Sequence, residues 1–250
     1  MKIVVCIKRV PDTEARIRVA ADGRSVDVTG VKFITNPYDE FALEAALRLR
    51  EAEGEGEVVA LSLGDTGIAE TLRAALAMGA DSAVHLTTDR PLEGLAAAHA
   101  IAAELSGRDF DLALFGLKAI DDDLQAVGVM VAELIDLPAA TAVTEFRREG
   151  DRIIAEREVE GGMEVVELPT PCILTITKGA YEPRYASLKG IMAAKKKPFE
   201  EKAAMAEGDG GIQVESLQPP PERQPGRIVG EGPDAVPELL RILREQGFIA

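Results

Sequence analysis

The residues of this chain that could do chemistry are acidic or small, and they follow short apolar runs. Asp121, Asp122 and Asp123 follow the apolar run 111–115 and precede a helical pattern. One of them can cap that helix and the others complement its dipole, but three carboxylates facing a phosphate would repel it. We therefore expect any phosphate to bind backbone N–H groups, with these side chains turned away or bound to ribose. No His or further acid has ligand spacing, so no metal site is predicted.

Two other segments have residues suited to a ligand. The segment 36–40 opens a helical pattern, with Asn36 as N-cap, Pro37 at the first helical position and acids in the first turn. Plain capping explains these residues, but Tyr38 also offers a ring to a planar ligand. The turn 63–67 ends a strand and opens a helix, so its N–H groups could hold phosphate, although many tight turns look alike.

One segment is basic although the chain has a net charge of −15. Residues 178–198, the basic segment, hold six Lys and Arg residues against one acid, Glu182. A solvated face would explain the charges alone. The apolar Leu188, Ile191 and Met192 beside them favour a partner surface.

Several classes of protein are disfavoured. His85 and His99 are solitary, no catalytic residue is predicted, and motifs of serine hydrolases, zinc proteases and P-loop or Rossmann proteins do not occur. The acidic charge argues against nucleic acid. No apolar run reaches the ~18 residues of a membrane span, and residues 1–8 suit a strand better than a signal peptide. The two cysteines, Cys6 and Cys172, lie in apolar runs and fit a reducing cytoplasm.

Strands and helices alternate in the first half of the chain. Short apolar runs predict strands at 2–7, 57–63, 82–86 and 111–115, and periodic patterns predict helices near 38–53, 66–79, 91–106 and 122–136. This alternation predicts an α/β fold, a parallel twisted sheet covered by helices on both faces. Ligands bind outside the carboxyl ends of strands in such sheets.

The second half changes character. Residues 141–170 predict antiparallel hairpins, and 172–177 a returning buried strand. Residues 200–233, rich in Gly and Pro, read as an extended arm, and 234–246 as a short amphipathic helix. Such an arm could embrace another subunit, and packing back onto its own domain stays open.

The basic segment also carries a resemblance. Its sequence YEPRYASLKGIMAAKKKP over 181–198 resembles the signature EPRY-x-(S/T)-L-(K/P)-x-IM-x-AKKKP of the electron-transfer flavoprotein β subunit family. Further matches in order are 8–12, the helix opened by Asn36, 74–81 and the turn 121–123. Ordered matches over most of the chain are far more specific than any one of them.

The resemblance implies an electron carrier subunit, not an enzyme. It implies an adenine-nucleotide-binding, universal-stress-like fold over 1–199, with a hairpin insertion at about 141–170, a recognition loop at 181–198 and a partner-embracing arm over 200–250. The implied partner is an α subunit in an obligate heterodimer that mainly holds the FAD, while this subunit holds a structural AMP. Electrons would pass from acyl-CoA dehydrogenases of fatty acid oxidation to a membrane quinone oxidoreductase, without insertion of this chain into the membrane.

The family's nucleotide and docking residues carry over onto this sequence. The bifurcating branch, which holds a second FAD here, typically has DGDTAQVGP; Asp122, Leu124 and Val129 depart from it and favour AMP. The implied nucleotide set is Cys6, Asn36, Pro37, Tyr38, Asp39, Leu63, Gly116, Ala119, Ile120, Asp121, Asp122, Asp123, Gln125 and Val127. The implied docking set, with Leu188 as the anchor, is Leu188, Lys189, Ile191, Met192, Lys195, Lys196 and Lys197.

Two other functions share this fold type. A stand-alone adenine-nucleotide-binding regulatory module of universal-stress type would fit the first half, but it leaves the basic segment and the arm unexplained. An ATP-using ligase would need a Ser/Gly phosphate loop near residues 8–14, which Arg9-Val10-Pro11-Asp12 does not supply.

Overall fold

The computed structural model describes residues 1–205, 211–222 and 225–249. The contacts within the chain divide it into two units. The main unit comprises Met1–Ile17 and Val28–Glu215, and the small unit comprises Arg18–Asp27 and Ser216–Ala250. Residues 206–210, 223–224 and 250 of the predicted arm lie outside the described residues.

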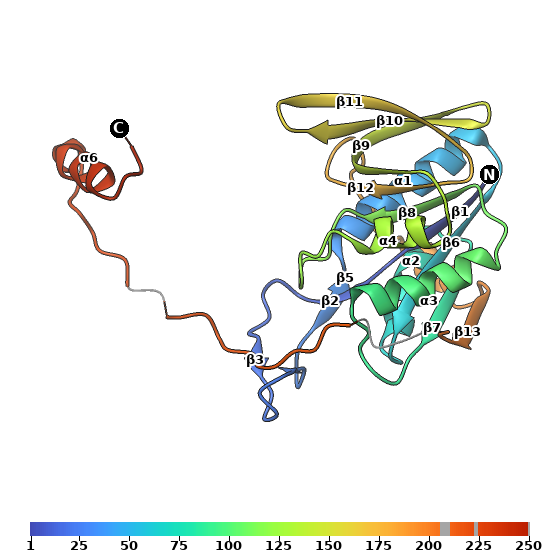
Figure 1. Cartoon of the computed structure of the whole chain (residues 1–250), viewed down its shortest axis with the longest axis horizontal. Helices are drawn as coiled ribbons and strands as arrows, with labels where there is room; N and C mark the ends of the chain where they lie inside the picture. The colour runs from blue at the N-terminus through green and yellow to red at the C-terminus, as the bar shows by residue number, and fades with distance from the viewer. Residues whose placement is uncertain (206–210, 223–224, 250) are drawn as a thin grey trace. The chain divides into compact units, whose positions relative to one another are not determined.

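One large sheet forms the centre of the main unit. Among the described residues it has nine strands, in the order β11 (Gly162–Pro169), β10 (Arg152–Val159), β9 (Ala139–Glu149), β12 (Cys172–Ile176), β8 (Leu112–Gly116), β1 (Lys2–Cys6), β6 (Glu57–Gly64), β7 (Ser82–Thr87) and β13 (Phe199–Ala203). Neighbours from β9 through β13 pair in parallel. Within the described part of this sheet, the antiparallel pairs are those of β10 with β9 and with β11. Figure 1 shows this hairpin region at one end of the sheet and β13 at the other.

Helices cover both faces of the sheet, which confirms the predicted fold class. One face packs against α1 (Pro37–Glu53), α2 (Ile68–Met78) and α5 (Leu188–Ala194), and the other against α3 (Gly94–Ser106) and α4 (Val127–Leu134). Side chains of β1 alternate between the faces: Ile3 and Val5 join the first core cluster, and Val4 and Cys6 join the second. A central strand buried on both faces therefore reads as a continuous apolar run.

Short elements complete the two units. In the main unit β2 (Arg9–Pro11) pairs with β5 (Phe33–Thr35), antiparallel. The small unit holds β3 (Arg18–Val19), β4 (Val26–Asp27), the 3-10 turn η1 (Pro233–Ala235) and α6 (Val236–Glu245). The strands β3 and β4 span two residues each and have no apolar run, so the sequence did not reveal them.

Two predicted segments differ from the structure, and a third is extended by it. The hairpins predicted at 141–170 are present, and because β9 pairs with β12 as well as β10, they continue the main sheet. The predicted arm loses its first residues, since 200–203 belong to β13 and pair with β7. The expected loop at 181–198 contains a helix, α5, which packs on α2.

Candidate functional site

The carboxyl ends of three neighbouring strands form one edge of the sheet. β1 lies between β6 and β8, with Cys6 opposite Leu61 and Val5 opposite Leu114. The segments that follow these strands therefore meet at this edge, as does the start of α1. Residues 117–126, the edge loop, connect β8 to α4 here.

Asn36 organises the edge loop from inside. Its side chain is buried, its Nδ2 donates to the carbonyl oxygen of Lys118 at 2.8 Å, and its Oδ1 accepts from the N–H of Ile120 at 3.2 Å. Asn36 occupies the N-cap position of α1, but its side chain makes no cap hydrogen bond. The expected capping role is therefore wrong, because the loop's backbone takes both ends of the amide.

Asp39 makes a second internal connection. Its Oδ2 accepts from the N–H of Lys8 at 2.7 Å and its Oδ1 from the N–H of Gly116 at 3.0 Å. Burial raises the pKa of Asp39 to about 7, against the lowering effect of these two hydrogen bonds, of Asn36 and of the Lys8 charge. A carboxylate in the first helical turn is thus bound to two strand ends.

The three aspartates of the edge loop form ion pairs with two lysines. The Nζ of Lys8 lies 2.8 Å from both Asp121 and Asp122, and the Nζ of Lys118 lies 3.0 Å from Asp123. The Lys118 ammonium also lies 5.8 Å from the centre of the half-buried Tyr38 ring. The sequence did not identify Lys8 or Lys118 as members of this cluster. The available signal was that each lysine lies two residues after the end of a strand.

The start of α4 leaves backbone donors uncapped. Its N-cap, Ala126, has no side chain that could accept a hydrogen bond, and α4 begins at Val127. Asp123 and Gln125 just before it have φ angles of 51° and 54°, which turn the chain sharply toward the helix. Helix N-terminal N–H groups without a cap are suited to an anion. That phosphate binds backbone groups stays a prediction, and the N–H groups at the start of α4 are the candidate donors.

The remaining predicted nucleotide residues surround this edge. Pro37, Ala119 and Ile120 are half-buried, and so is Leu63 at the end of β6. Cys6 is buried beneath them at the end of β1, and burial raises the pKa of its thiol well above the ordinary value. A hollow of about 580 Å³ lies elsewhere, at the amino ends of β1 and β6, and is lined by paired charges such as Arg108 and Glu104. That hollow includes none of the predicted site residues.

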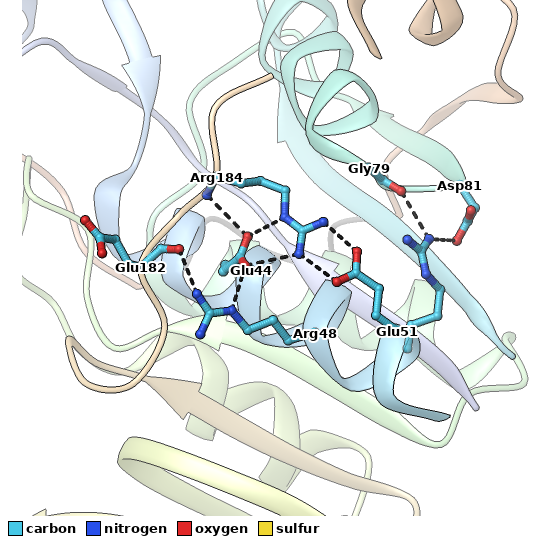
Figure 2. A network of polar contacts seen from close by, with 8 residues as sticks. Glu44, Arg48, Glu51, Gly79, Asp81, Glu182 and Arg184 are labelled. Carbon is cyan, nitrogen blue, oxygen red and sulfur yellow. Dashed lines mark hydrogen bonds and ion pairs between the residues drawn. The ribbon is translucent and has the colours of Figure 1, made fainter. Parts of the chain in front are cut away.

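A network of ion pairs holds the start of the basic segment on α1 (Figure 2). The Arg184 guanidinium lies 2.8 Å from Oε2 of Glu44 and 2.5 Å from Oε1 of Glu51. Arg48 also binds Glu44, at 2.8 Å, and donates to the carbonyl oxygens of Ala180 and Glu182. Burial acts to raise the pKa of Glu44, but hydrogen bonds from Arg184 and Arg48 outweigh it and hold that pKa below its usual value.

The helix of the basic segment turns apolar side chains to solvent. Ser187 caps α5 by accepting from the N–H of Gly190, while Leu188 is 83% and Met192 73% exposed. Ile191 is also exposed, as are Lys189, Lys195 and Lys196. Tyr185, which the sequence-based docking set omits, is 98% exposed.

Lys197 differs from the other predicted docking residues. Its Nζ donates to the carbonyl oxygen of Leu76, in the last turn of α2, at 2.9 Å and to that of Ala80, just after the helix, at 2.5 Å. It therefore serves the C-terminal end of a helix in its own fold. The structure groups six of the seven predicted docking residues on exposed positions and places Lys197 apart from them.

The helix of the small unit, α6, has apolar side chains that are exposed to solvent. No residue of α6 is buried, and Val236, Leu239 and Leu240 are exposed. Throughout the residues that the structure describes, no group of three or more His, Cys, Asp or Glu could hold a metal ion. Among those same residues, no helix has the length and apolar character to cross a membrane.

Comparison with known proteins identifies the family. The model of the electron transfer flavoprotein domain matches residues 25–207. Proteins named electron transfer flavoprotein subunit beta from Homo sapiens and Bradyrhizobium diazoefficiens are 38% and 39% identical, over 98% and 100% of both chains. A protein of Oryza sativa subsp. indica, whose name adds "mitochondrial", is 39% identical over the full length of both chains. The chain therefore belongs to the β-subunit family of the electron transfer flavoproteins.

Proposed function

We propose that this chain pairs with an α subunit and carries electrons from acyl-CoA and related dehydrogenases to a membrane quinone oxidoreductase. The observation that carries the proposal is the set of exposed apolar side chains on α5, in a segment that ion pairs hold on α1, in a chain of this family. FAD, held mainly by the α subunit, would supply the redox chemistry. This chain then contributes binding and docking, so it is a carrier subunit and not an enzyme. The cytoplasmic location stays a prediction from the sequence.

The carboxyl edge fits an adenine nucleotide, and we assign AMP to it. The side chains of the edge loop and Lys8 carry three negative and two positive charges, so they offer no net attraction to phosphate. The uncapped N–H groups at the start of α4 supply the donors instead. Tyr38 and the half-buried backbone around Ala119 and Ile120 would flank the rest of the nucleotide.

Docking of a dehydrogenase follows from exposure and charge. Burying Leu188 in a pocket of the partner would contribute roughly 1.5–3 kcal/mol, which suits a complex that must form and release. Lys189, Lys195 and Lys196, exposed beside it, would steer an acidic partner surface. The Arg184 network keeps the base of this surface fixed, so little ordering is needed on binding.

Nucleotide stoichiometry tests the proposal. The chain expressed alone should hold no tightly bound flavin, and the purified heterodimer should release one FAD and one AMP. Acid extraction followed by chromatography measures both nucleotides. Two FAD per heterodimer would overturn the AMP assignment, and failure to form a heterodimer with any α subunit would overturn the carrier function.

A further inference from the structure

The carboxylate of Asp39 is engaged inside the protein, although the resemblance implies that Asp39 belongs to the nucleotide set. The residue is 6% exposed, and both carboxylate oxygens accept backbone N–H groups. The donors, Lys8 and Gly116, follow or end two neighbouring parallel strands, β1 and β8. Asp39 therefore connects the first turn of α1 to both strand ends.

The contact between Asp39 and Gly116 leaves no room for a side chain at position 116. A Cβ on Gly116 would lie 2.3 Å from Oδ1 of Asp39 and 2.7 Å from Cβ of Tyr38. The absence of a side chain at Gly116 is thus what lets the strand end approach α1. The edge loop begins at the residue after Gly116. Asn36, the N-cap of α1, lies three residues before Asp39 in the sequence and binds the backbone of that loop.

We propose that Asp39 is a positioning residue that fixes the edge loop for nucleotide binding, and that its carboxylate is not itself a ligand. The inference rests on the proposed nucleotide function. With both amides held, Lys8 reaches Asp121 and Asp122, and the edge loop keeps the form in which α4 presents its uncapped N–H groups. Without the carboxylate, the N–H groups of Lys8 and Gly116 both lose their hydrogen-bond acceptor.

The same carboxylate titrates near neutrality. Burial raises its pKa to about 7, and the ionisable groups that face it are the Lys8 ammonium and the Cys6 thiol, both at the β1 end. From α1 it meets the uncharged Asn36, and from β8 only the backbone of Gly116. The ionised carboxylate accepts both N–H groups in charge-assisted hydrogen bonds, and the protonated acid does not. The positioning effect should therefore be present above pH 7 and weaken as pH falls through that value.

Calorimetric titration of the nucleotide-free heterodimer with AMP tests the inference. Asp39→Asn keeps the size but replaces one acceptor with a donor that faces an N–H group, so we expect about tenfold or more weaker binding. The control is Glu53→Gln at the far end of α1, where Glu53 pairs with Arg148. Measuring wild type and Asp39→Asn from about pH 6 to about pH 8.5 gives an affinity ratio in which ionisation of the AMP phosphate cancels.

Two results together support the proposal. The ratio of AMP affinities of wild type and Asp39→Asn should fall toward one below about pH 7. The melting temperatures of the two proteins should also be too similar to explain the loss of affinity. Equal affinity of wild type and Asp39→Asn at every pH would overturn it, and so would a ratio independent of pH. If the wild type binds no AMP, the proposed nucleotide function fails instead. In that case NMR tests separately whether Asp39 holds the two backbone amides. If it does, the amide chemical shifts of Lys8 and Gly116 must follow the titration of the Asp39 carboxyl.

Discussion

At the scale of single residues, exposure divides the basic segment into side chains that face a partner and side chains that hold the fold. Leu188 and Met192 are largely exposed, whereas Ala194 is buried and Lys197 donates to two backbone carbonyls. An exposed apolar side chain on a capped helix contributes little to folding. Substituting Leu188 therefore probes docking without disturbing the fold.

Leu188→Ala should weaken docking of an acyl-CoA dehydrogenase by roughly 10- to 150-fold, which corresponds to a loss of 1.5–3 kcal/mol of apolar burial. The flavin spectrum and the melting temperature should not change, because Leu188 is largely exposed and belongs to neither core cluster. Steady-state electron transfer against dehydrogenase concentration measures the effect. Val165→Ala, which removes an exposed apolar side chain from β11, is the control. Unchanged kinetics for Leu188→Ala would remove its docking role.

The sequence predicted which residues lie at the candidate site better than it predicted their hydrogen-bond and ion-pair partners. Asn36 and Asp39 stood out as helix-start residues, a pattern that depends only on local neighbours. Their actual partners, Lys118, Ile120 and Gly116, lie far away in sequence. The pairing of Lys8 with Asp121 likewise depends on β1 lying beside β8. Such contacts follow from strand order, which periodicity alone does not give.

At the scale of elements, α1 connects the candidate nucleotide edge to the base of the basic segment. Its first turn holds Asp39, its middle holds Glu44 and its last turn holds Glu51, and both glutamates bind Arg184 (Figure 2). Glu44 is only 3% exposed, so its charge needs these partners. The network fixes where the chain leaves the core before α5.

Arg184→Ala should lower the free energy of unfolding by about 1–3 kcal/mol at neutral pH, because two charge-assisted pairs are lost while Arg48 still neutralises Glu44. The ion pairs lower the pKa of Glu44 and Glu51, so their stabilisation is present above about pH 4.5 and is lost as pH falls below it. Urea unfolding of wild type and variant should therefore converge toward acid pH.

The matched control for this prediction is Arg147→Ala. Arg147 pairs with Glu149 at the surface, and both side chains are more than half exposed. Its removal should cost no more than about 1 kcal/mol. An Arg184→Ala variant as stable as this control, or one whose stability gap does not narrow in acid, would show that the network is not needed to hold the segment.

Elements with strong periodicity were predictable, and elements made by tertiary pairing were not. The central strands appeared as apolar runs because they are buried on both faces. β13 has the sequence FEEKA and pairs only with β7 at the sheet edge, so no apolar run marks it. α5 spans seven residues, too few to show a helical period, and its apolar side chains face solvent.

At the scale of the whole molecule, the chain has a main unit with a complete core and a small unit with little core. The main unit contains both core clusters and all of the candidate nucleotide residues. In the small unit, the exposed apolar side chains of α6 sit on a helix too short to be stable by itself in water. We therefore expect the small unit to serve assembly more than the stability of the main unit.

Deleting residues 216–250 should weaken assembly with the α subunit by at least about a hundredfold, since burying two leucines alone contributes about 3 kcal/mol or more. The melting temperature of the truncated chain should stay close to that of the full chain, because the main unit ends at Glu215. The double substitution Leu239→Ser and Leu240→Ser should reproduce most of the loss without shortening the chain, whereas Glu231→Gln should not. Affinity for the α subunit can be measured from binding of each variant to that subunit immobilised on a surface.

If the truncated chain binds as tightly as the full chain, the predicted arm has no role in assembly. If instead the truncated chain melts well below the full chain, residues 216–250 stabilise their own subunit.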